Sequence, residues 1–159
     1  MTIHWRTVPF DALTLREVHD LFKLRVDIFV VEQRCAYPEV DGHDIEALHV
    51  LGANEAGQLV ACARILPAPS GGLRRIGRVV VHPDLRGSGI AHQLMDHVLD
   101  TLNERFGTRS SMLSAQAQLE SFYSDHGFVR TGPAYDWDGI PHVDMEHRDD
   151  RQAQRSRVT

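Results

Sequence analysis

The chain has 159 residues, which is enough for one domain with its own hydrophobic core and short for two. Hydrophobic residues make up 42% of it and charged residues 25%, so neither a disordered nor a fibrous protein is indicated. The net charge of −5 argues against nucleic acid as a partner, and because the first residues show neither a leader pattern nor an apolar run that could span a membrane, we expect a cytoplasmic protein without a membrane partner.

The first third of the chain predicts a strand, a helix and a loop. Residues 3–8 have strand character. Thr14 and Glu17 stand at the spacing of a capping box, in which each side chain satisfies a backbone N–H at the start of a helix. Apolar residues then recur every three or four positions as far as Val31, which extends the predicted helix. The polar segment of residues 32–44 is a predicted loop with room for one helical turn.

The rest of the chain predicts further strands and two helices. Two apolar runs joined by a turn at Gly57 indicate an antiparallel hairpin, and the strongest helical pattern covers residues 90–106. The predicted strands are 47–53, 59–66, 75–82, 111–117, 128–131 and 142–147, with a second helix at 118–126. We therefore expect one domain over residues 1–147 and a polar, disordered tail at 148–159.

A glycine-containing loop, "RGSGIA", connects a predicted strand to the start of the helix at 90–106. Free backbone N–H groups and the helix dipole make such a point a binding site for phosphates. Gly87 and Gly89 let the backbone approach a diphosphate closely, and Arg86 adds a charged donor. A Walker A loop is absent, and a Rossmann GxGxxG would need glycine where His92 stands. Taken alone, the loop is also compatible with a plain glycine turn before a helix.

The same residues resemble a known superfamily. Residues 86–91 match the Q/R-x-x-G-x-G/A signature of the GCN5-related N-acetyltransferases (GNAT), and "FYSDHGF" is similar to the family's Y-x-x-x-G-F pattern. Longer segments, "LRVDIFVVEQRCAYPEVDGHD", "SAQAQLESFY" and "YDWDGIPHVDM", resemble the ElaA-type subfamily over nearly the whole chain. The resemblance implies a GNAT fold of the α/β (α+β) class, with a mixed, largely antiparallel central sheet flanked by helices.

The resemblance implies acetyl-CoA as co-substrate and assigns residues to it. In the family, the strand before the loop holds the pantetheine arm through backbone groups, and the loop's N–H groups hold the pyrophosphate. Gln116 stands where the family often has a pantetheine-binding asparagine. The expected cofactor-binding residues are Val79, Val80, Val81, Arg86, Gly87, Ser88, Gly89, Ile90, Ala91 and Gln116. Tyr123 matches the tyrosine that protonates the departing CoA thiolate in many members; the alternative role is packing in the core.

The general base is less clear from the sequence. Many members of the family carry a glutamate on the strand before the loop, where this chain has Arg74, Arg75 and Arg78. An imidazole suits the task, so His49 is the first candidate and His142 the second. A hydrogen-bonded structural role is the alternative for either histidine.

The expected reaction is transfer of an acetyl group from acetyl-CoA to a primary amine by direct attack. The acceptor is a small amine or a protein amino group, and the acidic segment "EVDGHD" favours a cationic one. Cys35 and Cys62 belong to no CxxC motif, so no disulfide or metal is expected, and Cys35 is not needed as a nucleophile. Arg25 and Phe29 are also similar to residues of the acyl-homoserine lactone synthases. A lactone-synthase-like enzyme, a non-catalytic CoA-binding module and a homodimer stay open.

Overall fold

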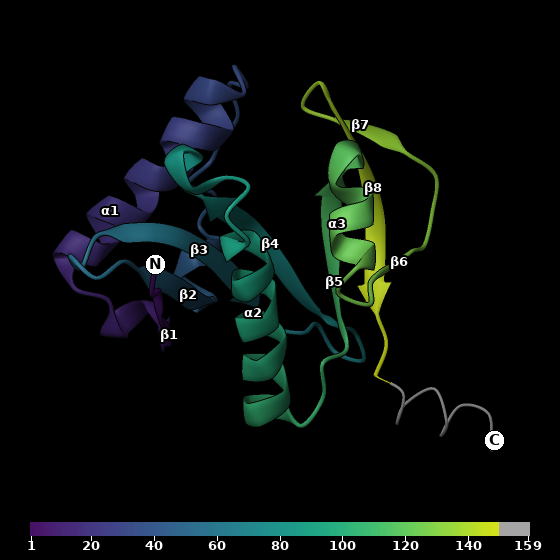
Figure 1. Cartoon of the computed structure of the whole chain (residues 1–159). Helices are drawn as coiled ribbons and strands as arrows, with labels where there is room; N and C mark the ends of the chain where they lie inside the picture. Colours follow the sequence, from purple (N-terminus) through teal and green to yellow (C-terminus); the bar gives the residue numbers. More distant parts are fainter. Residues whose placement is uncertain (150–159) are drawn as a thin grey trace.

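The computed structural model describes residues 1–149, and this part contains an eight-stranded sheet with helices packed against it (Figure 1). The strands lie in the order β1-β2-β3-β4-β5-β8-β6, and β7 pairs with β8. Each pair of neighbours in this part is antiparallel except β4 and β5, which are parallel. The strands are β1 His4–Pro9, β2 Leu48–Ala53, β3 Leu59–Leu66, β4 Arg74–Val81, β5 Ser111–Gln116, β6 Val129–Arg130, β7 Tyr135–Trp137 and β8 Ile140–His147. The mixed, largely antiparallel sheet expected from the sequence is confirmed.

Helices cover both faces of the sheet (Figure 1). Helix α1, Leu15–Arg25, continues as a π-helical segment over Val26–Glu32 and packs on one face. Helices α2, Ile90–Phe106, and α3, Glu120–Ser124, pack on the other. The alternation of side chains along β3 separates the two cores, because Ala61, Ala63 and Ile65 contact the α2 side while Cys62 contacts the α1 side.

The predicted capping box opens α1. The backbone N–H of Glu17 donates to Thr14 Oγ1 at 3.1 Å, and the backbone N–H of Thr14 donates to Glu17 Oε1 at 2.9 Å. Both donors lack a partner within the helix, so the reciprocal pair fixes where the helix begins. Short 3-10 turns connect other elements, at Phe10–Ala12, His43–Glu46, Pro83–Leu85 and Ala117–Leu119.

Strands β4 and β5 separate soon after they meet. They pair at Arg74 with Ser111 and at Arg75 with Met112, and no further pair joins them within residues 1–149. Just beyond this point β4 carries a bulge, since Cys62 of β3 pairs with Val80 and Arg64 pairs with Gly77. Arg78 lies in the bulge with φ at +50°, an uncommon value for a side chain other than glycine. A bulge bends its strand, and here it bends β4 where the two strands diverge.

Two features of the C-terminal part were not expected from the sequence. The segment predicted as a helix at 118–126 is a 3-10 turn followed by the short α3. Strand β7 was missed; it forms a hairpin with β8 through Asp138 and Gly139, whose φ angles are +53° and +82°. The Asp-Gly pair is a known signal for this turn and could have predicted it. The expected tail lies, from residue 150 onward, outside the described residues. Within residues 1–149 no helix is long and apolar enough to cross a membrane.

Candidate active site

A cavity of about 490 Å³ lies where β4 and β5 separate. Several of the residues expected to bind acetyl-CoA line it: Val79, Val80, Val81, Arg86, Ala91 and Gln116. Tyr123 lines it as well. The separation of two parallel strands therefore brings the end of β4, the start of α2, the end of β5 and α3 around one space. A substrate can enter such a space between the strands without breaking a formed β-ladder.

The loop before α2 has the geometry of an anion site. Gly87 and Gly89 have φ angles of +76° and +85°, and a Cβ added at either would meet no atom within 4 Å, so open space lies beside both. Gly89 is the N-cap of α2, and no side chain caps the first N–H groups of this 17-residue helix. Those groups are thus available to a ligand, with the positive end of the helix dipole behind them. Ser88 and Ile90 complete the loop between Arg86 and Ala91.

Arg86 is held at the edge of this loop by an ion pair. Its Nη2 donates at 2.7 Å to Oε2 of Glu32, the last residue of the π-helical segment that continues α1. The carboxylate raises the pKa of Arg86 through this hydrogen bond, and the guanidinium lowers the pKa of Glu32 in turn. Both side chains are largely exposed, so the pair orients the arginine more than it stabilises the fold.

Tyr123 and Gln116 lie on two different sides of the cavity. The Tyr123 ring makes edge contacts with Phe122 and Phe128, and only 6% of the residue is exposed. Burial raises the pKa of Tyr123, so its phenol keeps its proton. Gln116 donates to Gln33 Oε1 at 3.1 Å and accepts from Gln118 at 2.7 Å, which orients its amide.

The residues of β5 point alternately to two faces. Leu113 and Ala115 pack in the core against α2, so Ser114 and Gln116 lie on the opposite face. There β8 places His142 opposite Gln116 and Asp144 opposite Ser114. The cavity thus has one wall on the α2–α3 side and another on the far face of β5 and β8, where His142 lines it.

His142 is oriented as a proton acceptor. Its Nδ1 lies 2.7 Å from the carbonyl oxygen of Ile140, and because a carbonyl only accepts, Nδ1 carries the hydrogen of the neutral ring. Nε2 then has a free electron pair. The ring packs beside Tyr135 and Trp137 of β7.

His49 lies elsewhere. It is fully buried on β2 and is not among the residues that line the cavity. Its Nε2 lies 2.8 Å from the carbonyl oxygen of Asp44, so Nε2 carries the hydrogen. Burial lowers the pKa of His49 and keeps the ring neutral. This placement argues against the expectation that His49 is the base and assigns it a structural contact.

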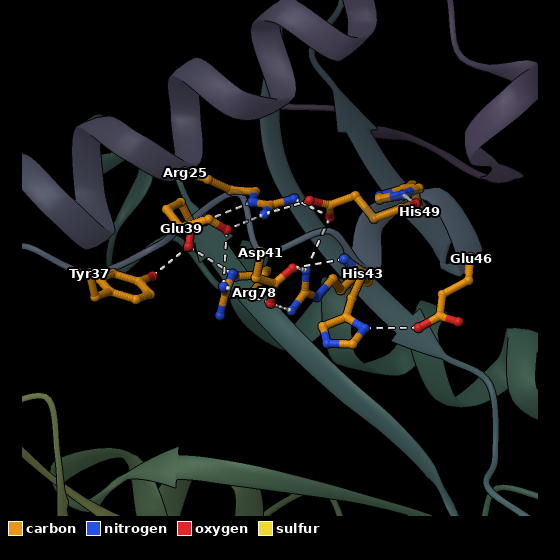
Figure 2. Close-up of polar contacts among 10 residues, drawn as sticks. Arg25, Tyr37, Glu39, Asp41, His43, Glu46, His49 and Arg78 are labelled. Carbon is orange, nitrogen blue, oxygen red and sulfur yellow. Dashed lines mark hydrogen bonds and ion pairs between the residues drawn. The ribbon is translucent and has the colours of Figure 1, made fainter.

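A buried ion-pair network shares Arg64 and Arg78 with the lining of the cavity, and Figure 2 shows its polar contacts. Arg25 of α1 is 1% exposed; its Nε donates to Glu39 at 2.8 Å and its Nη1 to Asp44 at 2.6 Å. Burial would lower the pKa of Arg25, but the two carboxylates outweigh it and raise that pKa. The arginine therefore remains charged and holds the loop of residues 39–46 against α1.

Two arginines of the sheet bind the same loop from the other side (Figure 2). Arg64 Nη2 donates to Asp41 at 2.7 Å, and Arg78 Nε lies 2.7 Å from Glu39. These contacts hold Arg78 in its unusual backbone conformation and fix the bulge of β4. The expectation that the acidic segment attracts a cationic acceptor does not hold for Glu39, Asp41 and Asp44, because arginines of the same chain already neutralise them.

Sequence reasoning missed two lining residues of the far face, Arg75 and Ser114. The family resemblance places Arg75 only near the position where many members carry a glutamate. The alternation of "SMLSAQ" was a usable signal, because it places Ser114 on the face opposite Leu113.

Comparison with known proteins gives one consistent result. Residues 29–148 match the family model described as an acetyltransferase (GNAT) domain. The chain is 43% identical over 137 residues to the UPF0039 protein C11D3.02c of Schizosaccharomyces pombe, covering 86% of this chain and 91% of that one. It is 38% identical over 147 residues to protein ElaA of Escherichia coli, covering 90% and 95%.

Solved structures agree. The crystal structure of E. coli ElaA matches with a TM-score of 0.85 at 36% identity, over 92% of this chain and 100% of that one. An acyl-CoA N-acyltransferase from Pseudomonas aeruginosa matches with a TM-score of 0.86 at 38% identity, over 92% and 99%. The acyl-homoserine lactone synthase BjaI matches with a TM-score of 0.78 at 20% identity, over 95% and 85%, which shows a shared fold alone.

Proposed function

The chain belongs to the GNAT acetyltransferase family, and we propose on that premise that it transfers an acetyl group from acetyl-CoA to an amine. One observation carries the proposal: a single cavity at the β4–β5 separation joins the uncapped start of α2 to a buried phenol and to an oriented imidazole. These are the three parts that direct transfer requires, namely an anion site for the donor, an acid for the leaving group and a base for the amine.

The donor would lie along β4. Within residues 86–91, the N–H groups that the loop does not use would hold its pyrophosphate, since those of Arg86 and Ser88 donate to Pro83 and Leu85. The free backbone groups of residues 79–81 would hold its pantetheine arm, and the Gln116 amide a polar group of that arm. Since β4 has left β5 by this point, its backbone groups on that side are not used by the sheet. This supports the assignment of Val79, Val80 and Val81.

The proposed chemistry removes two protons from the ammonium nitrogen and delivers one proton to sulfur. An alkyl amine is neutral in only about one molecule in a thousand at pH 7, so a base must remove a proton from its ammonium form before attack. His142 Nε2 accepts it. The amine nitrogen then forms a bond to the thioester carbonyl carbon, the carbon–sulfur bond breaks, and the Tyr123 hydroxyl donates a proton to the CoA thiolate. The nitrogen releases its second proton as the amide forms, and that proton restores the Tyr123 hydroxyl, while His142 passes the first proton to solvent. The products are an amide and CoA.

The two alternative functions differ from the proposed one in the reaction that the purified chain would catalyse. A lactone-synthase-like enzyme would need an acceptor that can close a ring, and it is supported only by the similarity at Arg25 and Phe29 and by the shared fold. A CoA-binding module would bind acetyl-CoA without using it. The test is incubation of the purified chain with acetyl-CoA and a panel of amines, with CoA thiol release followed over time and the N-acetyl product identified by mass spectrometry. Amine-dependent thiol release supports the proposal; tight acetyl-CoA binding without release for any amine would favour the binding module.

A further inference from the structure

The charged groups in the cavity wall are mostly arginines. Arg64, Arg75, Arg78 and Arg86 line the cavity, whereas its lining carboxylates are Glu32, already paired with Arg86, and Asp138 on the exposed β7–β8 turn. Arg64 and Arg78 are bound by the carboxylates of the loop at 39–46. Arg75 differs: among residues 1–149 no carboxylate forms an ion pair with it.

Arg75 is nonetheless held in one position. Its Nη1 donates to Ser114 Oγ at 2.9 Å, and Ser114 Oγ donates to Asp144 Oδ1 at 2.9 Å. The Tyr135 hydroxyl donates to the same Asp144 oxygen at 2.6 Å. The hydroxyl of Ser114 donates its single hydrogen to Asp144, so it can only accept from Arg75, and it does so as a neutral group. The half-buried guanidinium of Arg75 therefore has four further N–H donors and, among the described residues, no carboxylate partner in the wall of the cavity.

Arg75 and His142 share a face. Ile76 packs in the core on the α2 side, so Arg75 points to the far face of the sheet, where it meets Ser114. His142 lies opposite Gln116, and this pair is two residues along the strands from the pair formed by Ser114 and Asp144. Ser114, which Arg75 contacts, and Gln116, which pairs with His142, lie about 7 Å apart along β5, and β8 is about 5 Å to the side. The base and the cation are thus roughly 8–9 Å apart, which one small molecule can span.

We propose that Arg75 binds a carboxylate of the acceptor, which makes the acceptor an amino acid or a close relative of one. The inference rests on the proposed function for the placement of the amine at His142. A carboxylate matches the planar fork of a guanidinium, and burial in a cavity makes the pair selective. A carboxylate on the acyl group is the other source, but the base that must touch the acceptor shares the face of Arg75, and the loop that would hold the donor lies at the start of α2.

The first test compares matched acceptors. Thiol release from acetyl-CoA is measured with free amino acids and with the corresponding amino acid amides, for the wild type, Arg75→Gln and Arg75→Lys. The wild type should prefer at least one amino acid over its amide, and Arg75→Gln should raise the KM of that amino acid by about ten- to a hundredfold while the KM of acetyl-CoA stays unchanged. Arg75→Lys should restore part of the preference.

The neighbouring arginine supplies the control. Arg74 stacks over Phe106 at 3.4 Å and is not among the lining residues, so Arg74→Gln removes the same charge without touching the cavity. It should keep the preference for the amino acid. Equal turnover of amino acids and amides by the wild type, or an unchanged preference in Arg75→Gln, overturns the inference and leaves the proposed function standing. Selective use of succinyl-CoA over acetyl-CoA that is lost in Arg75→Gln overturns it in favour of the acyl group.

A second measurement does not depend on turnover. Calorimetry on the chain saturated with CoA, titrated with N-acetyl amino acids and with their amides, reports the carboxylate site directly. Binding of the acids that is lost in Arg75→Gln and retained in Arg74→Gln supports the inference even if no amine is turned over. Absence of any difference between acids and amides contradicts it.

Discussion

Arg25 and Asp44 form a two-bond ion pair inside the protein, with Nη1 and Nη2 donating to the two carboxylate oxygens at 2.6 and 3.1 Å. The side chains are 1% and 4% exposed. The pair joins α1 to the loop that also binds Arg64 and Arg78, so it supports the wall of the cavity from behind. Removing one partner of this buried pair should lower the free energy of unfolding more than removing one partner of an exposed pair.

Removing the cation should be costly. Arg25→Met leaves Glu39 and Asp44 buried without a compensating charge, and we expect the free energy of unfolding to fall by about 3–5 kcal/mol. Urea unfolding at pH 7 measures it. The control is Lys23→Met, which breaks the exposed Lys23–Asp27 pair on the same helix and should change stability little. Similar losses in the two variants would contradict the role of the buried network.

The same network predicts acid sensitivity. Burial would raise the pKa of Asp44, but hydrogen bonds and charge from Arg25 and Arg64 outweigh it and hold that pKa below its ordinary value of 3.8. Unfolding lets Asp44 return to the ordinary value, so its contribution is present above pH 3.8 and is lost as the pH falls through the lower pKa of the folded state. Urea unfolding from pH 7 downward should show a steep loss below about pH 4. Asp44→Asn should be less stable at pH 7 and show a shallower acid slope; a parallel slope would exclude this source.

Local patterns predicted the parts of this molecule that short-range physics controls. The Thr14–Glu17 capping box and the glycine loop of residues 86–91 depend on neighbours in sequence, and both could be placed from the sequence alone. The bulge at Arg78 depends on ion pairs to a loop nearly forty residues away along the chain, about which the periodicity of β4 says nothing.

The candidate base shows the same limit. The local sequence does not distinguish His49 from His142, because each lies in a predicted strand. The pairing of β8 with β5 places His142 opposite Gln116, whereas β2 lies far from β5 in the sheet order. Which histidine reaches the cavity is decided by long-range strand order, and no local signal encodes it.

Tyr123→Phe separates catalysis from binding. Only the hydroxyl is deleted, and the ring can keep its edge contacts with Phe122 and Phe128. We expect kcat to fall by about a hundredfold or more while the affinity for acetyl-CoA is retained. Because burial raises the pKa of Tyr123, its loss of a proton should not limit kcat at pH 9. Unchanged kcat with a good amine would assign the tyrosine to packing.

The two histidines should respond in opposite ways. His142→Gln removes the proton acceptor from the half-buried far face, so kcat/KM for the amine should fall by about a hundredfold with little effect on stability. His49→Gln disturbs a fully buried contact to the Asp44 carbonyl, so it should lower the unfolding midpoint and leave kcat near the wild-type value at a temperature where it is folded. The reverse pattern would restore His49 as the base.

Every step proposed above requires acyl-CoA to bind at the start of α2, and a calorimetric titration of acetyl-CoA measures that binding. The titration compares the wild type with Gly89→Ala and Gly57→Ala. Gly89 and Gly57 have positive φ angles of +85° and +79°, and a Cβ at either position would meet no atom within 4 Å. Each alanine should therefore lower the free energy of unfolding by a similar amount, about 1–2 kcal/mol. Gly57 lies in the turn between β2 and β3 and is not among the lining residues of the cavity. We expect saturable binding to the wild type and to Gly57→Ala, with affinity weakened about tenfold or more in Gly89→Ala, because its loop N–H groups no longer converge on the pyrophosphate. No binding to the wild type at millimolar acetyl-CoA, or equal affinity in all three proteins, would contradict it.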